Sequence, residues 1–282
     1  MEIRILDHQQ VLSLLPDRPI DGHKGSFGKV LLLCGSRGYT GAVTLAAMGA
    51  LRAGAGLTYL AVPESIYQII AVKLTEPVIY PLPDDAGTFG IQAKSLIADL
   101  LTNKDAVLIG PGIGQSEGSY LAVKTVLEQY VGPVILDADG INVLCTHKDI
   151  LRGRAAPTII TPHLGEFLRI GGNLSHGRIT AAESLAKDLG IIVVLKGHET
   201  IITDGSTTYK NPTGNPGMAT GGSGDVLAGI ITALVGQGLE PLEAAACGAW
   251  LHGASGDICA EEIGQYGMLP TDMLNTLPRL LK

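Results

Sequence analysis

Aromatic residues and net positive charge are both scarce in this chain of 282 residues. Phe, Trp and Tyr together make up 4% of the sequence, and its formal net charge at pH 7 is −7. Nucleic acids are bound through basic surfaces that neutralise phosphates, often with aromatic rings that stack on the bases. The composition therefore argues against a nucleic-acid-binding protein.

Cysteines and uninterrupted hydrophobic runs are scarce as well. The four cysteines lie far apart and form no CxxC pair, so we expect reduced thiols rather than a disulfide framework. The first 19 residues mix charges with apolar positions and resemble neither a secretory nor a transit peptide. The most apolar region, 41–62, is interrupted by Arg52 and by glycines, which argues against a membrane span. These features predict a cytoplasmic protein that is not bound to a membrane.

Hydrophobic residues, in contrast, make up 46% of the chain, which is enough for a large core. Short, almost continuously apolar runs alternate with segments of helical periodicity, as is typical of parallel strands that helices cover on both faces. The predicted strands are 29–34, 57–62, 77–82, 105–110, 133–138, 157–161 and 191–196. The predicted helices between them are 41–54, 91–102, 116–130, 164–171 and 179–189. We therefore expect a doubly wound α/β fold with a central, mostly parallel sheet.

The pattern changes after residue 196. The segments TIITDG and TTYKN are joined by a turn-forming DGS, which predicts an antiparallel hairpin that finishes one edge of the sheet. Three helices, at about 224–237, 241–261 and 270–280, are predicted to end the chain. No linker, repeat or low-complexity segment divides the sequence, so residues 1–282 are expected to form a single domain.

Loops that follow the strands are the candidate sites, because open parallel sheets bind ligands beyond the carboxyl ends of their strands. The glycine-rich loops at 35–42 and 110–114 are either tight turns or cradles for a ligand. His163 and Glu166 lie in TPHLGEF directly after a strand, where a histidine is structural or catalytic. Lys196 ends an apolar run, and its ammonium group either reaches solvent or meets an anion.

The stretch GNPGMATGGSGDVLAG, residues 214–229, is more specific. It has six glycines and leads into an apolar helix, so Ser223, Gly224 and Asp225 are predicted to lie in the first helical turn. Unpaired N–H groups and the helix dipole make such a turn a binding site for a phosphoryl group. Asp225 either caps the helix or takes a proton from a hydroxyl that attacks the phosphoryl group.

Taken in order, motifs between about residues 20 and 255 resemble those of the ADP-dependent NAD(P)H-hydrate dehydratases. They are HKGSFGKVLLLCGS, GAVTLAAMGALRAGAG, GPGIG, VILDADGINVL, TPHLGEF, LKGHET and NPTGNPGMATGGSGDVLAG. Within the last of them, GGSGD resembles the anion-hole motif of the wider ribokinase-like superfamily. The resemblance implies a ribokinase-like fold and a carbon–oxygen lyase that repairs hydrated NADH and NADPH.

The implied reaction starts with transfer of the β-phosphoryl group of ADP to the C6 hydroxyl of the (S)-hydrate of the nicotinamide ring. Phosphate is a good leaving group where hydroxide is a poor one, so the lone pair of the ring nitrogen can then expel it. The implied products are NAD(P)H, AMP and phosphate. ADP is the implied co-substrate and Mg²⁺ the implied cofactor.

The resemblance also implies roles for residues whose motifs match. Asp225 is the implied general base, and the implied anion hole consists of the amides of Gly222, Ser223 and Gly224. The implied nucleotide-binding residues are Lys196, Gly197, His198, Glu199, Thr200 and Gly224. The implied substrate-binding residues are Ala42, Gly112, His163 and Asp225. Related kinases often carry Asn-x-x-Glu where this chain has His163 and Glu166, which fits a dehydratase and leaves Glu166 to orient magnesium through water.

Two alternatives stay open. One is a ribokinase-like kinase of a vitamin precursor, in which the same aspartate activates an alcohol and the phosphate stays on the product; His163 counts against it. The other is a non-catalytic nucleotide-binding module, which would not need Asp225 beside an anion. The family implies an NAD(P)H-hydrate epimerase as functional partner, and we expect a homotetramer, consistent with a mean hydropathy of +0.30.

Overall fold

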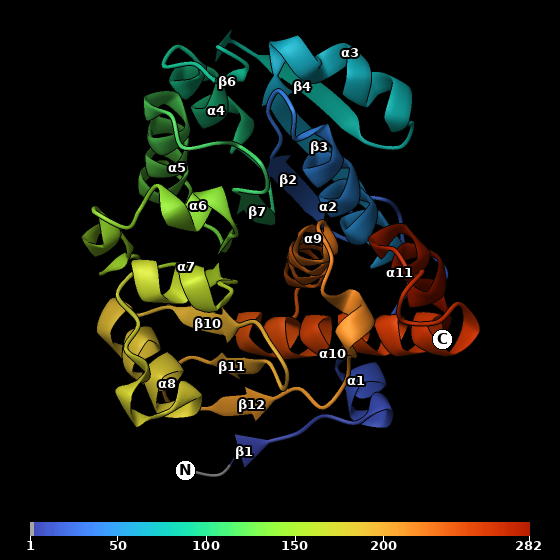
Figure 1. The fold of residues 1–282 in the computed structure, drawn as a ribbon. Helices are drawn as coiled ribbons and strands as arrows, with labels where there is room; N and C mark the ends of the chain where they lie inside the picture. Colours follow the sequence, from blue (N-terminus) through green and yellow to red (C-terminus); the bar gives the residue numbers. More distant parts are fainter. Residues whose placement is uncertain (1–2) are drawn as a thin grey trace.

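A computed structural model of the chain describes residues 3–282. Its centre is a ten-stranded sheet in the order β1-β12-β11-β10-β9-β8-β7-β2-β3-β4 (Figure 1). The seven strands from β10 to β4 in this order are all parallel to one another. They are β2 (Lys29–Leu33), β3 (Leu57–Pro63), β4 (Val78–Leu82), β7 (Ala106–Ile109), β8 (Val134–Leu136), β9 (Thr158–Ile160) and β10 (Ile192–Leu195). All seven fall on predicted strands, which confirms the mostly parallel sheet.

The other edge of the sheet differs from the prediction. β11 (Ile201–Thr203) pairs antiparallel with both β10 and β12 (Thr208–Lys210), which confirms the hairpin. The hairpin does not finish the sheet, however, because β1 (Ile3–Arg4) pairs in parallel with β12 and forms the edge. A strand of two residues is too short for alternation to reveal it in a sequence. Two further short strands, β5 (Asp84–Asp85) and β6 (Thr88–Phe89), form a separate hairpin.

Alternate residues of the central strands face two helical layers. Val30 and Leu32 of β2 pack against one layer, and Leu31 and Leu33 pack against the other. The first layer comprises α1 (His8–Leu14), α2 (Thr40–Arg52), α3 (Glu64–Lys73), α9 (Ser223–Gly236), α10 (Pro241–Glu262) and α11 (Pro270–Thr276). The second comprises α4 (Ala93–Leu100), α5 (Glu117–Gln129), α6 (Asp139–Asn142), α7 (Leu164–Arg169) and α8 (Arg178–Leu189). Figure 1 shows α4 to α8 on one side of the molecule and α2, α9, α10 and α11 on the other.

Four helical segments depart from the prediction. The short helices α1 and α6 were not predicted, nor was α3, which follows β3 with no loop to mark its start. The predicted helix 270–280 is α-helical only to Thr276 and continues as a 3₁₀ helix, Leu277–Leu280, because Pro278 has no N–H for an α-helical bond. Other 3₁₀ turns are Lys148–Leu151, Leu174–His176 and Pro216–Met218. Within residues 3–282, none of the helices combines the length and the hydrophobicity that a membrane span requires.

Helix α9 is fixed by a close crossing with α2. A Cβ atom on Gly229 would lie 2.1 Å from the carbonyl oxygen of Ala46, and one on Gly49 would lie 2.6 Å from that of Val226. Only glycine permits so short a distance between the two backbones. The crossing therefore fixes the position of α9, whose first turn contains the predicted anion hole.

Candidate active site

The carboxyl ends of three neighbouring strands contribute charged side chains to one cluster. Asp137 follows β8, Glu166 lies in the helix that follows β9, and Lys196 follows β10. Lys196 Nζ is 2.9 Å from Asp137 Oδ1 and 4.0 Å from Glu166 Oε2. The first turn of α9 reaches the same place, since a Cβ atom on Gly224 would lie 3.2 Å from Lys196 Nζ. The cluster thus joins the ends of the strands to the glycine-rich motif.

The sequence left two possibilities for the Lys196 ammonium group, contact with solvent or contact with an anion. The structure excludes the first. The Lys196 side chain is 19% exposed, and those of Asp137 and Glu166 are 2% and 5% exposed. Thr161 Oγ1 donates a second hydrogen bond to Asp137 Oδ1, at 2.6 Å. Burial lowers the pKa of Lys196, but the carboxylates of Asp137 and Glu166 more than offset this and raise it. The lysine is therefore a cation held inside the cluster.

The first turn of α9 has the structure of an anion site. Gly222 is the N-cap with a left-handed φ of 96°, and Ser223, Gly224 and Asp225 follow as the first three helical residues. Within residues 3–282 the N–H groups of Gly222, Gly224 and Asp225 donate to no protein acceptor. The Ser223 N–H donates to the Thr220 carbonyl at 3.3 Å, so its amide is less available than predicted. Unpaired N–H groups at a helix start attract a phosphoryl oxygen.

Asp225 does not cap the helix, so that alternative is wrong. No side-chain capping bond is present at the start of α9, and in the described part of the chain the Asp225 carboxylate accepts no hydrogen bond. Burial and the neighbouring Asp137 raise the pKa of Asp225, and Lys196 lowers it, with a result of about 7. A carboxylate with this pKa can accept a proton from a hydroxyl near neutral pH.

His163 and Glu166 form a capping box at the start of α7. His163 Nδ1 accepts the N–H groups of Gly165 and Glu166, at 2.9 and 3.3 Å, and Glu166 Oε2 accepts the His163 N–H at 2.9 Å. His163 Nε2 lies 3.4 Å from Glu166 Oε1. Both residues thus have a structural role, and a contact between His163 and the substrate stays a prediction.

A direct magnesium site is not evident. Among residues 3–282, no group of three or more His, Cys, Asp and Glu residues is placed to hold a metal ion. Both carboxylate oxygens of Glu166 already face donors, at His163 and Lys196. The residues therefore do not fit a metal bound directly by the protein, and the predicted water-mediated role of Glu166 stays untested.

The predicted nucleotide loop, 196–200, joins β10 to β11 and is held by Arg178, the first residue of α8. The Arg178 guanidinium donates to the carbonyls of His198 and Leu195, at 2.6 and 3.2 Å. Gly197 has a φ of 146°, and a Cβ atom there would lie 2.9 Å from Arg178 Nη2. The exposed loop thus has a defined shape, although sequence analysis did not identify the arginine that supports it.

Ala42 and Gly112, two predicted substrate-binding residues, lie side by side. A Cβ atom on Gly112 would lie 2.9 Å from Ala42 Cβ, and Ser36 Oγ donates to the Gly112 carbonyl at 2.7 Å. The same glycine-rich loop contacts the cluster, because a Cβ atom on Gly110 would lie 1.9 Å from the Asp137 carbonyl oxygen. The loops after β2 and β7 therefore continue the candidate site along the carboxyl ends of the parallel strands.

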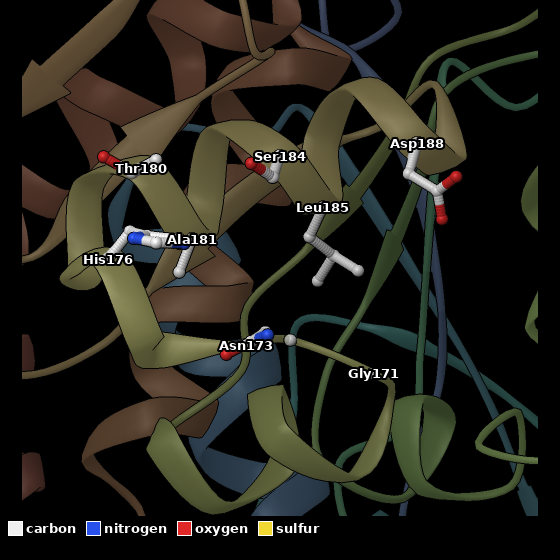
Figure 2. A pocket seen from close by; sticks show the side chains of 9 residues that line it. Gly171, Asn173, His176, Thr180, Ala181, Ser184, Leu185 and Asp188 are labelled. Atoms are coloured by element: carbon white, nitrogen blue, oxygen red, sulfur yellow. The ribbon is translucent and has the colours of Figure 1, made fainter.

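A pocket of about 270 Å³ lies apart from these residues (Figure 2). Thr180, Ser184 and Asp188 line it from α8, and Asn173 and His176 line it from the preceding segment. No predicted site residue is among its lining residues. It is therefore not part of the candidate site.

Comparisons with known proteins agree with the motifs. The sequence profile of the NAD(P)H-hydrate dehydratase family matches residues 30–279. A bifunctional NAD(P)H-hydrate repair enzyme of Moorella thermoacetica is 44% identical over 286 residues, which cover 99% of this chain and 54% of that enzyme. The ADP-dependent (S)-NAD(P)H-hydrate dehydratase of Cenarchaeum symbiosum is 34% identical, with 100% of this chain and 98% of the relative covered. The chain spans about half the length of the bifunctional relatives that it matches.

A solved structure agrees as well. The ADP/ATP-dependent NAD(P)H-hydrate dehydratase of Bacillus subtilis, co-crystallised with ATP and Mg²⁺, is 32% identical and has a TM-score of 0.85, covering 99% of this chain and 98% of that one. The likeness to solved ribokinase-like proteins confirms the predicted fold class. The profile match and the full-length relative lead to one conclusion: this chain belongs to the NAD(P)H-hydrate dehydratase family.

Proposed function

We propose that this chain is an ADP-dependent (S)-NAD(P)H-hydrate dehydratase, which converts hydrated NADH or NADPH and ADP into NAD(P)H, AMP and phosphate. Family membership supports the reaction, and the full-length relative named for ADP supports the co-substrate. One observation of the site carries the proposal. The Asp225 carboxylate, with a pKa of about 7 and no hydrogen-bond partner in the described chain, lies in a helical turn with unpaired N–H groups.

We assign the residues of the site the following roles in this reaction. Asp225 takes the proton of the C6 hydroxyl as its oxygen bonds to the β-phosphorus of ADP and the bond from that phosphorus to AMP breaks. The amides of Gly222 and Gly224 hold the transferred group, with a smaller contribution from Ser223. Lys196 neutralises phosphate charge on the nucleotide. The ring nitrogen then expels phosphate from C6, and loss of a proton from C5 restores the double bond.

The remaining parts of the nucleotide and substrate sites are proposed from the matching motifs. Gly197, His198, Glu199 and Thr200 would line the nucleotide, and Ala42, Gly112 and His163 would line the hydrated dinucleotide. We propose that Mg²⁺ enters with the nucleotide, and no step above depends on a protein ligand to it.

Partners and assembly are proposals as well. We propose an NAD(P)H-hydrate epimerase as the functional partner that supplies the (S)-hydrate, an activity that fits the bifunctional repair enzymes to which this chain is similar. We propose a cytoplasmic homotetramer of single-domain subunits, so light scattering should give about four times the chain mass of 29.3 kDa. A mass of one chain at micromolar concentration would contradict the tetramer.

The direct test of the activity uses acid-generated NADH hydrate with ADP, with ATP or with no nucleotide. We expect the absorbance of the dihydronicotinamide ring to return with ADP, and inorganic phosphate to accumulate in equal amount. A phosphorylated product that accumulates without free phosphate would instead identify a small-molecule kinase.

Replacing Arg178 by lysine should weaken ADP binding about tenfold. The guanidinium holds the His198 carbonyl of the nucleotide loop and the Leu195 carbonyl at the end of β10, and a single ammonium group cannot keep both of these modest hydrogen bonds. Calorimetric titration with ADP measures the effect. Arg152→Lys is the matched control, because Arg152 forms an exposed ion pair with Asp188 outside the loop. Equal ADP affinity in both variants would contradict a supporting role for Arg178.

The stability of the protein should depend on pH through Asp225. Its pKa of about 7 in the folded chain lies above the ordinary value of 3.8, so the folded state binds this proton more tightly than the unfolded state. Stability from this group is present at low pH and is lost as the pH rises through 7. Asp225→Asn should therefore lose less stability than the parent between pH 5 and pH 8. Melting temperatures of both proteins at the two pH values test this, and parallel changes would contradict it.

A further inference from the structure

The loop that precedes the anion-binding turn lies on one face of helix α10. Asn211 Nδ2 donates to the carbonyl of Ala249 at 3.1 Å, and Thr213 Oγ1 donates to that of Trp250 at 2.9 Å. The loop and helix are in close contact, because a Cβ atom on Gly253 would lie 2.2 Å from Thr213 Oγ1. Side chains of the loop are thus bonded directly to the backbone of the helix.

Asp257, which lies further along α10 than Ala249, Trp250 and Gly253, fixes the start of the glycine-rich segment. Its Oδ2 accepts the N–H of Gly214 and its Oδ1 accepts Asn215 Nδ2, both at 2.9 Å. Asn215 in turn accepts the N–H of Gly217 at 3.0 Å. Both carboxylate oxygens of Asp257 are therefore used to hold the loop.

His252, on α10, contacts the other end of the segment. Its Nε2 is 3.2 Å from the hydroxyl oxygen of Ser223, the first residue of α9. His252 and Ser223 are 8% and 7% exposed. Burial lowers the pKa of His252 to about 4, so the imidazole is neutral and adds no charge beside the anion site. The Ser223 hydroxyl is thus engaged with the helix beneath it.

We infer that His252 and Asp257 are positioning residues for phosphoryl transfer: together they hold residues 214–223 at both ends, so that the N–H groups of Gly222 and Gly224 at the start of α9 stay unpaired. This inference rests on the proposed function and deepens it. Neither residue needs to touch substrate. Since the turn would bind the transferred group most tightly in the transition state, loosening it should lower kcat more than it changes the KM for ADP.

The test compares His252→Leu, His252→Gln and Asp257→Asn with the parent in the ADP-dependent assay. We expect His252→Leu and Asp257→Asn to lower kcat by about 10–100-fold, as loss of an oxyanion-stabilising group does, with the KM for ADP within about threefold. His252→Gln should recover part of the loss, because its amide nitrogen can occupy the place of Nε2. Glu262→Gln, at the far end of α10 in a surface ion pair with Arg279, is the matched control and should behave as the parent.

Amide hydrogen exchange gives a readout that does not need activity. Exchange of residues 214–225 should be faster in His252→Leu and Asp257→Asn than in the parent, and unchanged in the control. If the folded variants keep kcat within twofold, or if leucine and glutamine at 252 are equally impaired, the inference is wrong. Should His252→Leu not fold, the glutamine and Asp257→Asn variants decide. A parent that never converts the hydrate would overturn the proposed function, whatever the exchange shows.

Discussion

Asp225→Asn is expected to keep the fold and to lose turnover by about 10²–10⁴-fold, the usual contribution of a positioned general base. The amide is similar in size to the carboxylate but does not take the hydroxyl proton. Within residues 3–282 the carboxylate accepts no hydrogen bond, so the substitution breaks none. ADP should bind as before, because the N–H groups of the turn are unchanged.

The measurement is ADP-dependent recovery of NADH by the two proteins, with ADP affinity determined in parallel. If the asparagine variant turned over within threefold of the parent, Asp225 would not be the base. A loss of ADP binding in that variant would instead place the carboxylate at the nucleotide.

Lys196→Ala has the second-largest expected effect. Loss of a charge-assisted hydrogen bond to phosphate should weaken ADP binding by about 1.5–3 kcal/mol, roughly 10- to 150-fold. The variant also leaves Asp137, which is 2% exposed, without the ammonium that lies 2.9 Å from it. We therefore expect a lower melting temperature as well, because an unpaired buried carboxylate is costly.

Two further variants separate these effects. Combining Lys196→Ala with Asp137→Asn should restore much of the melting temperature but not the affinity for ADP. Lys124→Ala, which removes an exposed lysine paired with Glu128, should change neither. Unchanged ADP affinity in a folded Lys196→Ala protein would limit the lysine to its pair with Asp137.

Features of the fold that depend on local sequence were predictable. Apolar runs marked the parallel strands, and glycines before an apolar helix marked the first turn of α9. Short elements were not, since the two residues of β1 show no periodicity. Helix α3 carried a helical signal in Ile66 and Ile70, four residues apart and both buried, but it begins where β3 ends.

Site residues that act through distant contacts were not predictable from local patterns. The bond from Lys196 to Asp137 spans 59 positions, that from Arg178 to His198 spans 20, and that between His252 and Ser223 spans 29. For Asp137 one signal was available, because it is an aspartate directly after an apolar strand in VILDAD. Arg178 and His252 offered no comparable one.

Two residues had roles that the sequence left open. Asp225 was also compatible with a helix cap, and the absence of a capping bond at the start of α9 decides against it. His163 was compatible with a structural or a binding role, and its imidazole caps α7. Hydrogen-bond geometry, which no spacing rule supplies, excludes the cap for Asp225 and gives His163 a structural role, while a contact between His163 and the substrate stays a prediction.

The central claim is that the C6 oxygen of the hydrate attacks the β-phosphorus of ADP. It is tested most directly by preparing NADH hydrate in ¹⁸O-labelled water and letting the enzyme react with it and ADP in ordinary water. The account predicts that each released phosphate carries one ¹⁸O atom, because the C6 oxygen leaves with the phosphoryl group. Recovery of NADH with unlabelled phosphate would contradict it, since water would then have attacked the nucleotide.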